Sequence, residues 1–107
     1  MIIKSNIVTA PYWAFTAWPF IVVLPKYADE PGIIAHEMVH YKEQAWITPI
    51  WWLRYALFKK FRIAAEVRAY SVQVAMGVMT HTEAAQWLMR YDSTLTFASA
   101  LAHFAKA

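Results

Sequence analysis

The sequence predicts an α+β fold that is mainly helical: a short N-terminal β-hairpin followed by a compact bundle of about four to five helices. Three observations lead to this prediction. Isoleucine, valine and aromatic residues concentrate in the first 25 residues, which is typical of strands. Helix-start and helix-stop signals then recur from Asp29 onward. The 107 residues are enough for one hydrophobic core but not for two.

The composition is apolar and slightly basic. Hydrophobic residues make up 60% of the chain and charged residues 16%, whereas an ordinary domain has about one quarter charged residues. The net charge is +3, but the basic residues are scattered apart from Lys59, Lys60 and Arg62, so we predict no nucleic-acid partner. The chain has no cysteine, which excludes disulfides and thiolate metal ligands and is compatible with a cytoplasmic protein.

The strand region covers residues 1–25. Residues 2–9 and 20–24 are rich in isoleucine and valine and are predicted to be two short strands. The connection between them, residues 10–19, holds four aromatic side chains, which we expect to cover the core.

Residues 5–25 carry no charge, and a stretch of this length is comparable with a membrane span or a signal peptide. However, Pro11 and Pro19 interrupt it, and Lys4 alone makes a poor basic flank. We therefore expect the stretch to belong to the folded domain and the protein to be cytoplasmic. A peripheral membrane contact remains open.

The first predicted helix, which would carry the active site, spans residues 30–46. Asp29 is a good N-cap, and Pro31 is tolerated in the first turn. Thr48 and Pro49 end the helix, because the residue before a proline disfavours the helical conformation. Apolar residues lie on most sides of this helix, so we expect it to be central and well covered.

Two further helices follow. Pro49 opens a short, strongly aromatic helix to about residue 59, which either covers the core or contacts a membrane surface or a partner. The next helix covers residues 62–77 and is signalled by its alanine content, with Gly77 as a plausible stop.

The C-terminal helices occupy residues 80–105. Thr80 or Thr82 caps the first of them, which runs to about residue 91. The last helix covers residues 93–105, although its first residues are also compatible with a strand.

The motif most informative about function is His36-Glu37-Met38-Val39-His40. Positions i and i+4 of a helix lie on the same face, so both imidazoles can reach one metal ion. Glu37 is one position further on and can flank a water bound to that metal. Two neutral nitrogen ligands and a carboxylate general base form the H-E-x-x-H arrangement of zinc hydrolases.

A catalytic zinc site needs a third protein ligand, and Glu66 is the best candidate. It lies 26 residues beyond His40, on a predicted helix that can pack antiparallel to the first and whose alanines permit close approach. The metzincin spacing is excluded because Trp46 stands where that class has its third histidine. Alternatively, Glu66 is a solvated carboxylate paired with a neighbouring arginine. Three other residues remain open as fallback ligands: His81, Asp92 and His103.

Further polar residues fall near the predicted metal. Glu43 and Gln44 can border the metal face of their helix by spacing, and Tyr41 lies one turn beyond the motif glutamate. Tyr70 is one turn after Glu66 and can donate a hydrogen bond to a ligand or to an oxyanion, which makes it a second catalytic candidate. The roles of Tyr41 and Gln44 stay open.

These residues resemble the gluzincin branch of zinc peptidases, in which H-E-x-x-H on one helix is joined by a glutamate from a following helix. The chain looks most like the very short minigluzincins, and like small phage and bacterial proteins with H-E-x-x-H-x-x-Q followed by E-x-x-A-Y. The resemblance covers about residues 20–76. The matching positions are His36, Glu37 and His40, then Gln44 (one residue late), Glu66, Ala69 and Tyr70.

The resemblance implies a single minimal zincin-like domain, residues 1–107, acting as a zinc metallopeptidase. His36, His40 and Glu66 would bind one Zn²⁺, and Glu37 would be the general base. Larger gluzincins often have an aspartate one turn after the glutamate ligand, to orient a zinc-bound histidine, where this chain has Tyr70.

The resemblance also implies that the strand before the active-site helix is an edge that pairs with an extended peptide or protein substrate. Val22, Val23 and Leu24 would then be substrate-binding residues. Peptide bonds are the default substrate by this resemblance, but a peptidoglycan cross-link or another amide uses the same chemistry.

Two other functions remain compatible with the sequence. The chain could be a non-catalytic or self-inhibited zinc-binding interaction protein, because a domain this small has few residues for a cleft. It could also be a small membrane-associated protein with an accidental motif, given its low charge and the pair Trp51-Trp52. The aromatic content additionally makes a homodimer credible.

Overall fold

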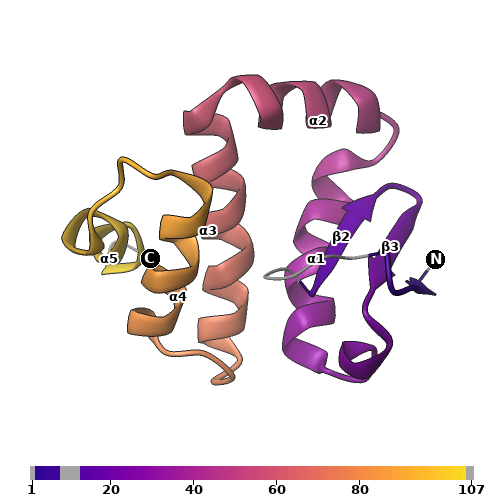
Figure 1. The fold of residues 1–107 in the computed structure, drawn as a ribbon, viewed down its shortest axis with the longest axis horizontal. Coiled ribbons are helices and arrows are strands. Elements are labelled where there is room, and N and C mark those ends of the chain that lie inside the picture. Colours follow the sequence, from indigo (N-terminus) through magenta and orange to yellow (C-terminus); the bar gives the residue numbers. More distant parts are fainter. Residues whose placement is uncertain (1, 8–12, 106–107) are drawn as a thin grey trace.

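The described residues, 2–7 and 13–105 of a computed structural model, form a small sheet followed by five helices (Figure 1). The strands are β1 (Ile2–Lys4), β2 (Ala14–Ala17) and β3 (Phe20–Val23), and the helices are α1 (Pro31–Gln44), α2 (Thr48–Leu57), α3 (Lys59–Ala75), α4 (His81–Leu88) and α5 (Phe97–Ala105). Two short 3₁₀ turns, η1 (Pro25–Tyr27) and η2 (Met89–Tyr91), precede α1 and follow α4. The predicted α+β, mainly helical class is confirmed.

The sheet differs from the predicted hairpin. Its order is β1-β3-β2, with β1 parallel and β2 antiparallel to β3, so the hairpin joins β2 to β3. The segment 10–19, expected to be a connection, therefore contains a strand. Alternate residues of β2 are buried, Ala14 and Thr16, but both are small, so the period of two carries little hydrophobic signal. Residues 8–12 of the predicted strand and connection lie outside the described residues.

Helix α1 is shorter than the predicted 30–46. Its N-cap is Glu30 rather than Asp29, and no side chain caps it. The helix ends at Gln44, and Trp46 adopts a left-handed backbone conformation with φ of 67°. A tryptophan rarely occupies this conformation, so no signal in the sequence showed that the helix ends at Gln44 and not at Trp46.

The later helices follow the predicted order with small shifts. Helix α3 begins three residues earlier than the predicted 62–77, and Gly77 follows it with φ of 75°, as expected of a glycine stop. Thr80 caps α4 in a capping box: Glu83 N–H donates to Thr80 Oγ1 (3.1 Å) and Thr80 N–H to Glu83 Oε1 (3.0 Å). The last segment is helical and begins at Phe97, so the strand alternative is excluded.

The elements are arranged around a central pair of helices. Helices α1 and α3 run in opposite directions side by side, the sheet covers the other side of α1, and α4 and α5 cover the other side of α3 (Figure 1). Helix α2 crosses one end of this pair and connects them (Figure 1). In the described part of the chain, no helix is both long and apolar enough to span a membrane.

A buried glutamine fixes α1 to the hairpin. Gln44 has no exposed surface; its Nε2 donates to the Thr16 carbonyl (2.8 Å) and its Oε1 accepts from Trp18 N–H (2.8 Å). Trp52 Nε1 of α2 donates to the same Thr16 carbonyl (3.1 Å). Three elements therefore meet at one residue of β2, which sets the position of the sheet against the helix pair.

Replacing Gln44 by alanine is expected to lower the free energy of unfolding by about 2–4 kcal/mol, since it leaves the part-buried N–H of Trp18 without its partner and opens a cavity. Chemical denaturation would measure the change. Gln86→Ala, at an exposed position of α4, is the matched control and should change stability by less than about 0.5 kcal/mol. Equal effects of the two substitutions would contradict the role given to Gln44.

Candidate metal centre

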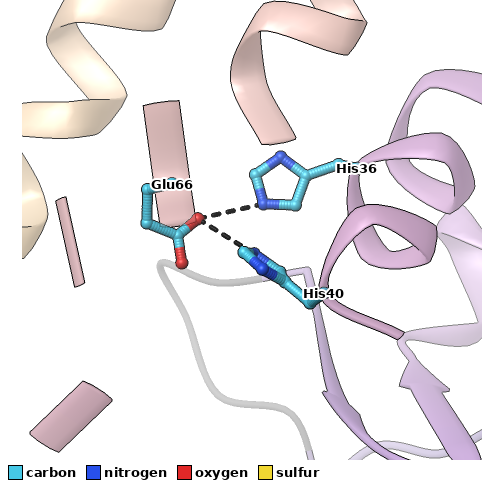
Figure 2. A group of neighbouring side chains, drawn as sticks. All are labelled: His36, His40 and Glu66. Atoms are coloured by element: carbon cyan, nitrogen blue, oxygen red, sulfur yellow. Dashed lines mark hydrogen bonds and ion pairs between the residues drawn. The ribbon is translucent and has the colours of Figure 1, made fainter. Parts of the chain in front are cut away.

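The motif histidines meet the predicted third ligand in the middle of the molecule. His36 and His40 project from α1 toward α3, where Glu66 points back at them (Figure 2). Glu66 Oε1 lies 3.1 Å from His36 Nε2 and 3.3 Å from His40 Nε2. All three residues are buried, with at most 4% of their surface exposed. The predicted convergence of His36, His40 and Glu66 is confirmed.

Each histidine is oriented by a second contact on its other ring nitrogen. His36 Nδ1 lies 2.7 Å from Gln73 Oε1, and His40 Nδ1 lies 3.3 Å from Glu43 Oε1. Both oxygens can only accept, so each Nδ1 carries the hydrogen. When the imidazoles are neutral, the hydrogen is therefore on Nδ1 and both Nε2 lone pairs are directed at Glu66. This is the tautomer that a histidine needs in order to bind a metal through Nε2.

With both imidazoles neutral, this arrangement would bring three electron-pair donors together without a positive charge. Two imidazole lone pairs and a carboxylate oxygen repel one another unless a proton or a metal cation lies between them. Burial alone would lower the pKa of His40, but hydrogen bonds to Glu43 and Glu66, with the charges of Glu66 and Glu37, raise it to about 10. Burial likewise opposes the ionised form of Glu66, yet the hydrogen bonds and charges of the two histidines hold its pKa well below its usual range.

The donor set fits one metal ion. The three ligand atoms lie within 4.8 Å of one another. In a tetrahedral site with zinc bonds of about 2.0–2.1 Å, neighbouring ligand atoms are about 3.3 Å apart, close to the 3.1 and 3.3 Å separations from Glu66 Oε1. In the described residues, no other set of His, Asp or Glu side chains converges in this way.

The motif glutamate lies beside the three ligands. Thr16 of β2 donates its hydroxyl to Glu37 Oε1 (2.8 Å) and lies 3.1 Å from the Glu37 carbonyl oxygen. Glu37 Oε2 is 3.8 Å from His36 Nε2. One carboxylate oxygen is thus held by the sheet, while the other is directed to the ligand atoms.

Glu66 is also held from α2. Tyr55 donates its hydroxyl to Glu66 Oε2 at 2.6 Å, so Oε1 is turned toward the histidines. No pattern in the sequence was read as placing Tyr55, Gln73 or Thr16 at the site. Gln73 could have been found, because it lies seven residues after Glu66 on the same helical face. Tyr55 and Thr16 reach the site only through tertiary packing.

Tyr70 lies next to the three ligands but does not line the cavity that opens onto them. Its ring packs edge-on against His36 with centroids 4.3 Å apart, and its hydroxyl lies 3.1 Å from the hydroxyl of Tyr91. Burial, together with the charge of Glu66, raises the pKa of both tyrosines, so both stay protonated. Tyr91 lines the cavity over the ligands, whereas Tyr70 is not among the residues that line it.

A cavity of about 550 Å³ opens onto the three ligands. Its walls come from β2, α1, α2, α3 and the turn η2, and its lining includes Phe15, Trp51, Trp52 and Tyr55. Glu37 and Glu66 are the acidic groups in this lining, and Arg62 and Arg90 are the basic ones. The three ligands are therefore buried yet reachable by a molecule in the cavity.

The predicted edge role of the strand at 20–24 is wrong. β3 is the central strand, and its backbone bonds to β1 on one side and β2 on the other, so it cannot add a substrate strand. Val22 and Val23 are buried, and Leu24 N–H donates to the Trp13 carbonyl. The edge facing the cavity is β2, whose Ala14, Phe15 and Thr16 all line it.

The remaining candidates lie elsewhere. His81 and His103 are exposed on α4 and α5, and Asp92 accepts from Thr94 and lies 3.7 Å from Lys59 Nζ. Tyr41 packs its ring near Trp18, with centroids 6.3 Å apart. Glu43 and Gln44, expected near the metal face, do border the site: Glu43 contacts His40, and Gln44 lines the cavity.

Comparison of the chain with family models, with curated proteins and with solved structures found no match. The likeness to H-E-x-x-H proteins therefore rests on the motif and on the buried His36, His40 and Glu66 group. What the residues establish is a three-ligand site, formed by α1 and α3, that can hold one metal ion.

Metal binding at pH 7 is expected to release about one proton. His40 is protonated in the metal-free protein, because its pKa is about 10, and only its neutral Nε2 can bind a metal. Apparent affinity should accordingly rise about tenfold per pH unit as the pH increases toward 10. Calorimetric titration with Zn²⁺ in two buffers of different ionisation enthalpy counts the protons released. Binding without proton release would contradict this charge assignment.

Proposed function

We propose that this protein is a zinc-dependent metallopeptidase that hydrolyses peptide amide bonds. The observation that carries the proposal is the convergence of His36 Nε2, His40 Nε2 and Glu66 Oε1, with Glu37 Oε2 only 3.8 Å from His36 Nε2. Two histidines and one carboxylate leave a tetrahedral position open, which is the ligand set of catalytic rather than structural zinc sites.

A zinc ion bound here would supply Lewis-acid activation of a water molecule and of the scissile carbonyl. Glu37 would accept the water proton on Oε2 as the water oxygen bonds to the carbonyl carbon. It would then pass that proton to the amide nitrogen as the carbon–nitrogen bond breaks, giving a carboxylic acid and an amine. Thr16 would keep Glu37 in place by holding Oε1.

Strand β2 offers an edge for an extended substrate. Leu24 N–H donates to the Trp13 carbonyl, so the backbone groups of residues 13, 15 and 17 face β3 and those of Ala14 and Thr16 face outward. The Thr16 carbonyl is occupied by Gln44 and Trp52, which leaves the Ala14 groups and the Thr16 N–H for a peptide backbone. This edge lies on the cavity side, which supports a peptide as the substrate.

A residue in the cavity wall has a buried hydrogen-bond donor without a partner in the described part of the chain. Trp51 is buried, lines the cavity, and packs edge-on against His40 with centroids 5.4 Å apart. Among the described residues, its Nε1 is the buried side-chain polar atom that has no hydrogen-bond partner. A buried donor without a partner is costly, so a substrate carbonyl that gains negative charge would be a favourable acceptor.

Glu37→Gln is expected to abolish hydrolysis while leaving the bound metal, since an amide cannot take the water proton but has nearly the same shape. The rate should fall by at least about 10²-fold. Cleavage of a fluorogenic peptide library by the zinc-loaded protein would measure activity, and elemental analysis would measure the metal.

The matched control is Glu30→Gln, at an exposed position at the start of the same helix, which should leave the rate unchanged. A fully active Glu37→Gln protein would rule out the mechanism. A wild-type protein that binds zinc and cuts no member of the library would instead favour a non-catalytic binding role.

A further inference from the structure

Helix α2 is apolar on two opposite faces. Its inner face carries Trp51 and Tyr55, which line the cavity over the metal ligands. Its outer face carries Ile50, Leu53 and Leu57, whose exposed fractions are 57%, 59% and 66%. A helix of a small domain normally places polar residues opposite its buried face, so this outer face is unusual.

The three aliphatic residues form one continuous stripe. They are spaced by three and four residues, which brings them to the same side of a helix within an arc of about 60°. Helix α2 crosses one end of the molecule, so its outer side faces away from the helix pair it connects (Figure 1). We call Ile50, Leu53 and Leu57 the outer face of α2.

Large aromatic residues flank α2 at both ends. Phe58 follows the helix and is 59% exposed. Trp46, in the turn before the helix, is 84% exposed and has a left-handed backbone conformation. The centroids of its ring and of the Trp18 ring are 4.6 Å apart. Exposed tryptophan and phenylalanine beside an aliphatic stripe are typical of a helix that lies in a membrane interface.

The charged residues of α2 and of the segments next to it in the sequence are all positive. Residues 45–65 contain Arg54, Lys59, Lys60 and Arg62 and no aspartate or glutamate. Arg54 and Lys60 are exposed, and the Arg54 guanidinium lies over the ring of Phe61, 5.0 Å from its centroid. Lys59 is also exposed, and lies 3.7 Å from the Asp92 carboxylate. An aliphatic stripe flanked by basic residues is complementary to an apolar layer covered by negative charge.

We propose that α2 docks this protein on the surface of a lipid bilayer that contains anionic lipids, with its outer face in the interface and its basic residues at the headgroups. A second copy of the chain suits this face less well. A symmetric α2–α2 contact would bring Arg54 near its counterpart, and residues 45–65 offer no carboxylate to pair with it.

Docking through α2 has a consequence for the metal centre. The inner face of the same helix walls the cavity, so the site would lie about one helix diameter, 10–12 Å, from the bilayer surface. The docking proposal stands on the exposed residues of α2 and does not depend on catalysis.

Cosedimentation with sucrose-loaded vesicles tests whether α2 docks the protein on an anionic bilayer. The wild-type protein should bind vesicles of phosphatidylcholine with 30% phosphatidylglycerol at least about tenfold more strongly than pure phosphatidylcholine, and 0.5 M salt should weaken this binding. The double variant Leu53→Ser with Leu57→Ser should lose at least about tenfold in partitioning. Arg54→Gln with Lys60→Gln should remove most of the preference for the anionic vesicles.

The control replaces two exposed apolar residues away from α2, Met76→Ser with Phe97→Ser, which are 44% and 41% exposed, and should bind like the wild type. Circular dichroism checks that each variant is folded. Equal pelleting of the wild type with both vesicle types, or equal pelleting of the α2 and control variants, would overturn the proposal. A second result would also overturn the proposal: sedimentation equilibrium shows that the wild type is a dimer and that the Leu53→Ser, Leu57→Ser variant is a monomer, while the wild type does not bind vesicles.

Discussion

The carboxylate of Glu66 lies between two imidazole nitrogens in the interior of the protein, and this arrangement constrains the rest of the structure. A buried negative charge without compensation would cost several kcal/mol, so the site needs a proton or a metal cation at its centre. Helices α1 and α3 must pack side by side to bring these groups together. The central helix pair thus carries the three candidate ligands, while the apolar clusters of the fold lie on its two outer sides, one between α3, α4 and α5 and the other between α1 and the sheet.

Neighbouring residues from α3, α2 and β2 hold the side chains of the site in place. Tyr55 from α2 fixes one oxygen of Glu66, Gln73 fixes the ring of His36, and Thr16 from β2 fixes Glu37. Gln44 joins β2 to the end of α1, which keeps Thr16 within reach. Replacing one of the three candidate ligands would therefore also remove a hydrogen bond from a neighbouring polar side chain.

The helical part and the ligand set could be predicted because they depend on local patterns. The spacing of His36 and His40 places both on one helical face, and the Thr80 capping box marks the start of α4. Strands were predicted in the segments that hold β1 and β3, but β2 and the strand order could not be predicted, because β2 has small buried residues and the parallel pairing of β1 with β3 joins segments that are far apart in the sequence. Tyr55 was missed for a related reason: its contact with Glu66 is set by how α2 crosses the helix pair, which no sequence period records.

Zinc stoichiometry tests the central claim most directly. Equilibrium dialysis followed by elemental analysis should find one zinc per wild-type chain, and Glu66→Gln should bind zinc at least about 100-fold more weakly, because it loses an anionic ligand but keeps its shape. Glu30→Gln, exposed on the same molecule, should bind like the wild type. A wild-type chain that retains no zinc, or a Glu66→Gln chain that binds it equally well, would contradict the assignment of His36, His40 and Glu66 as a metal centre.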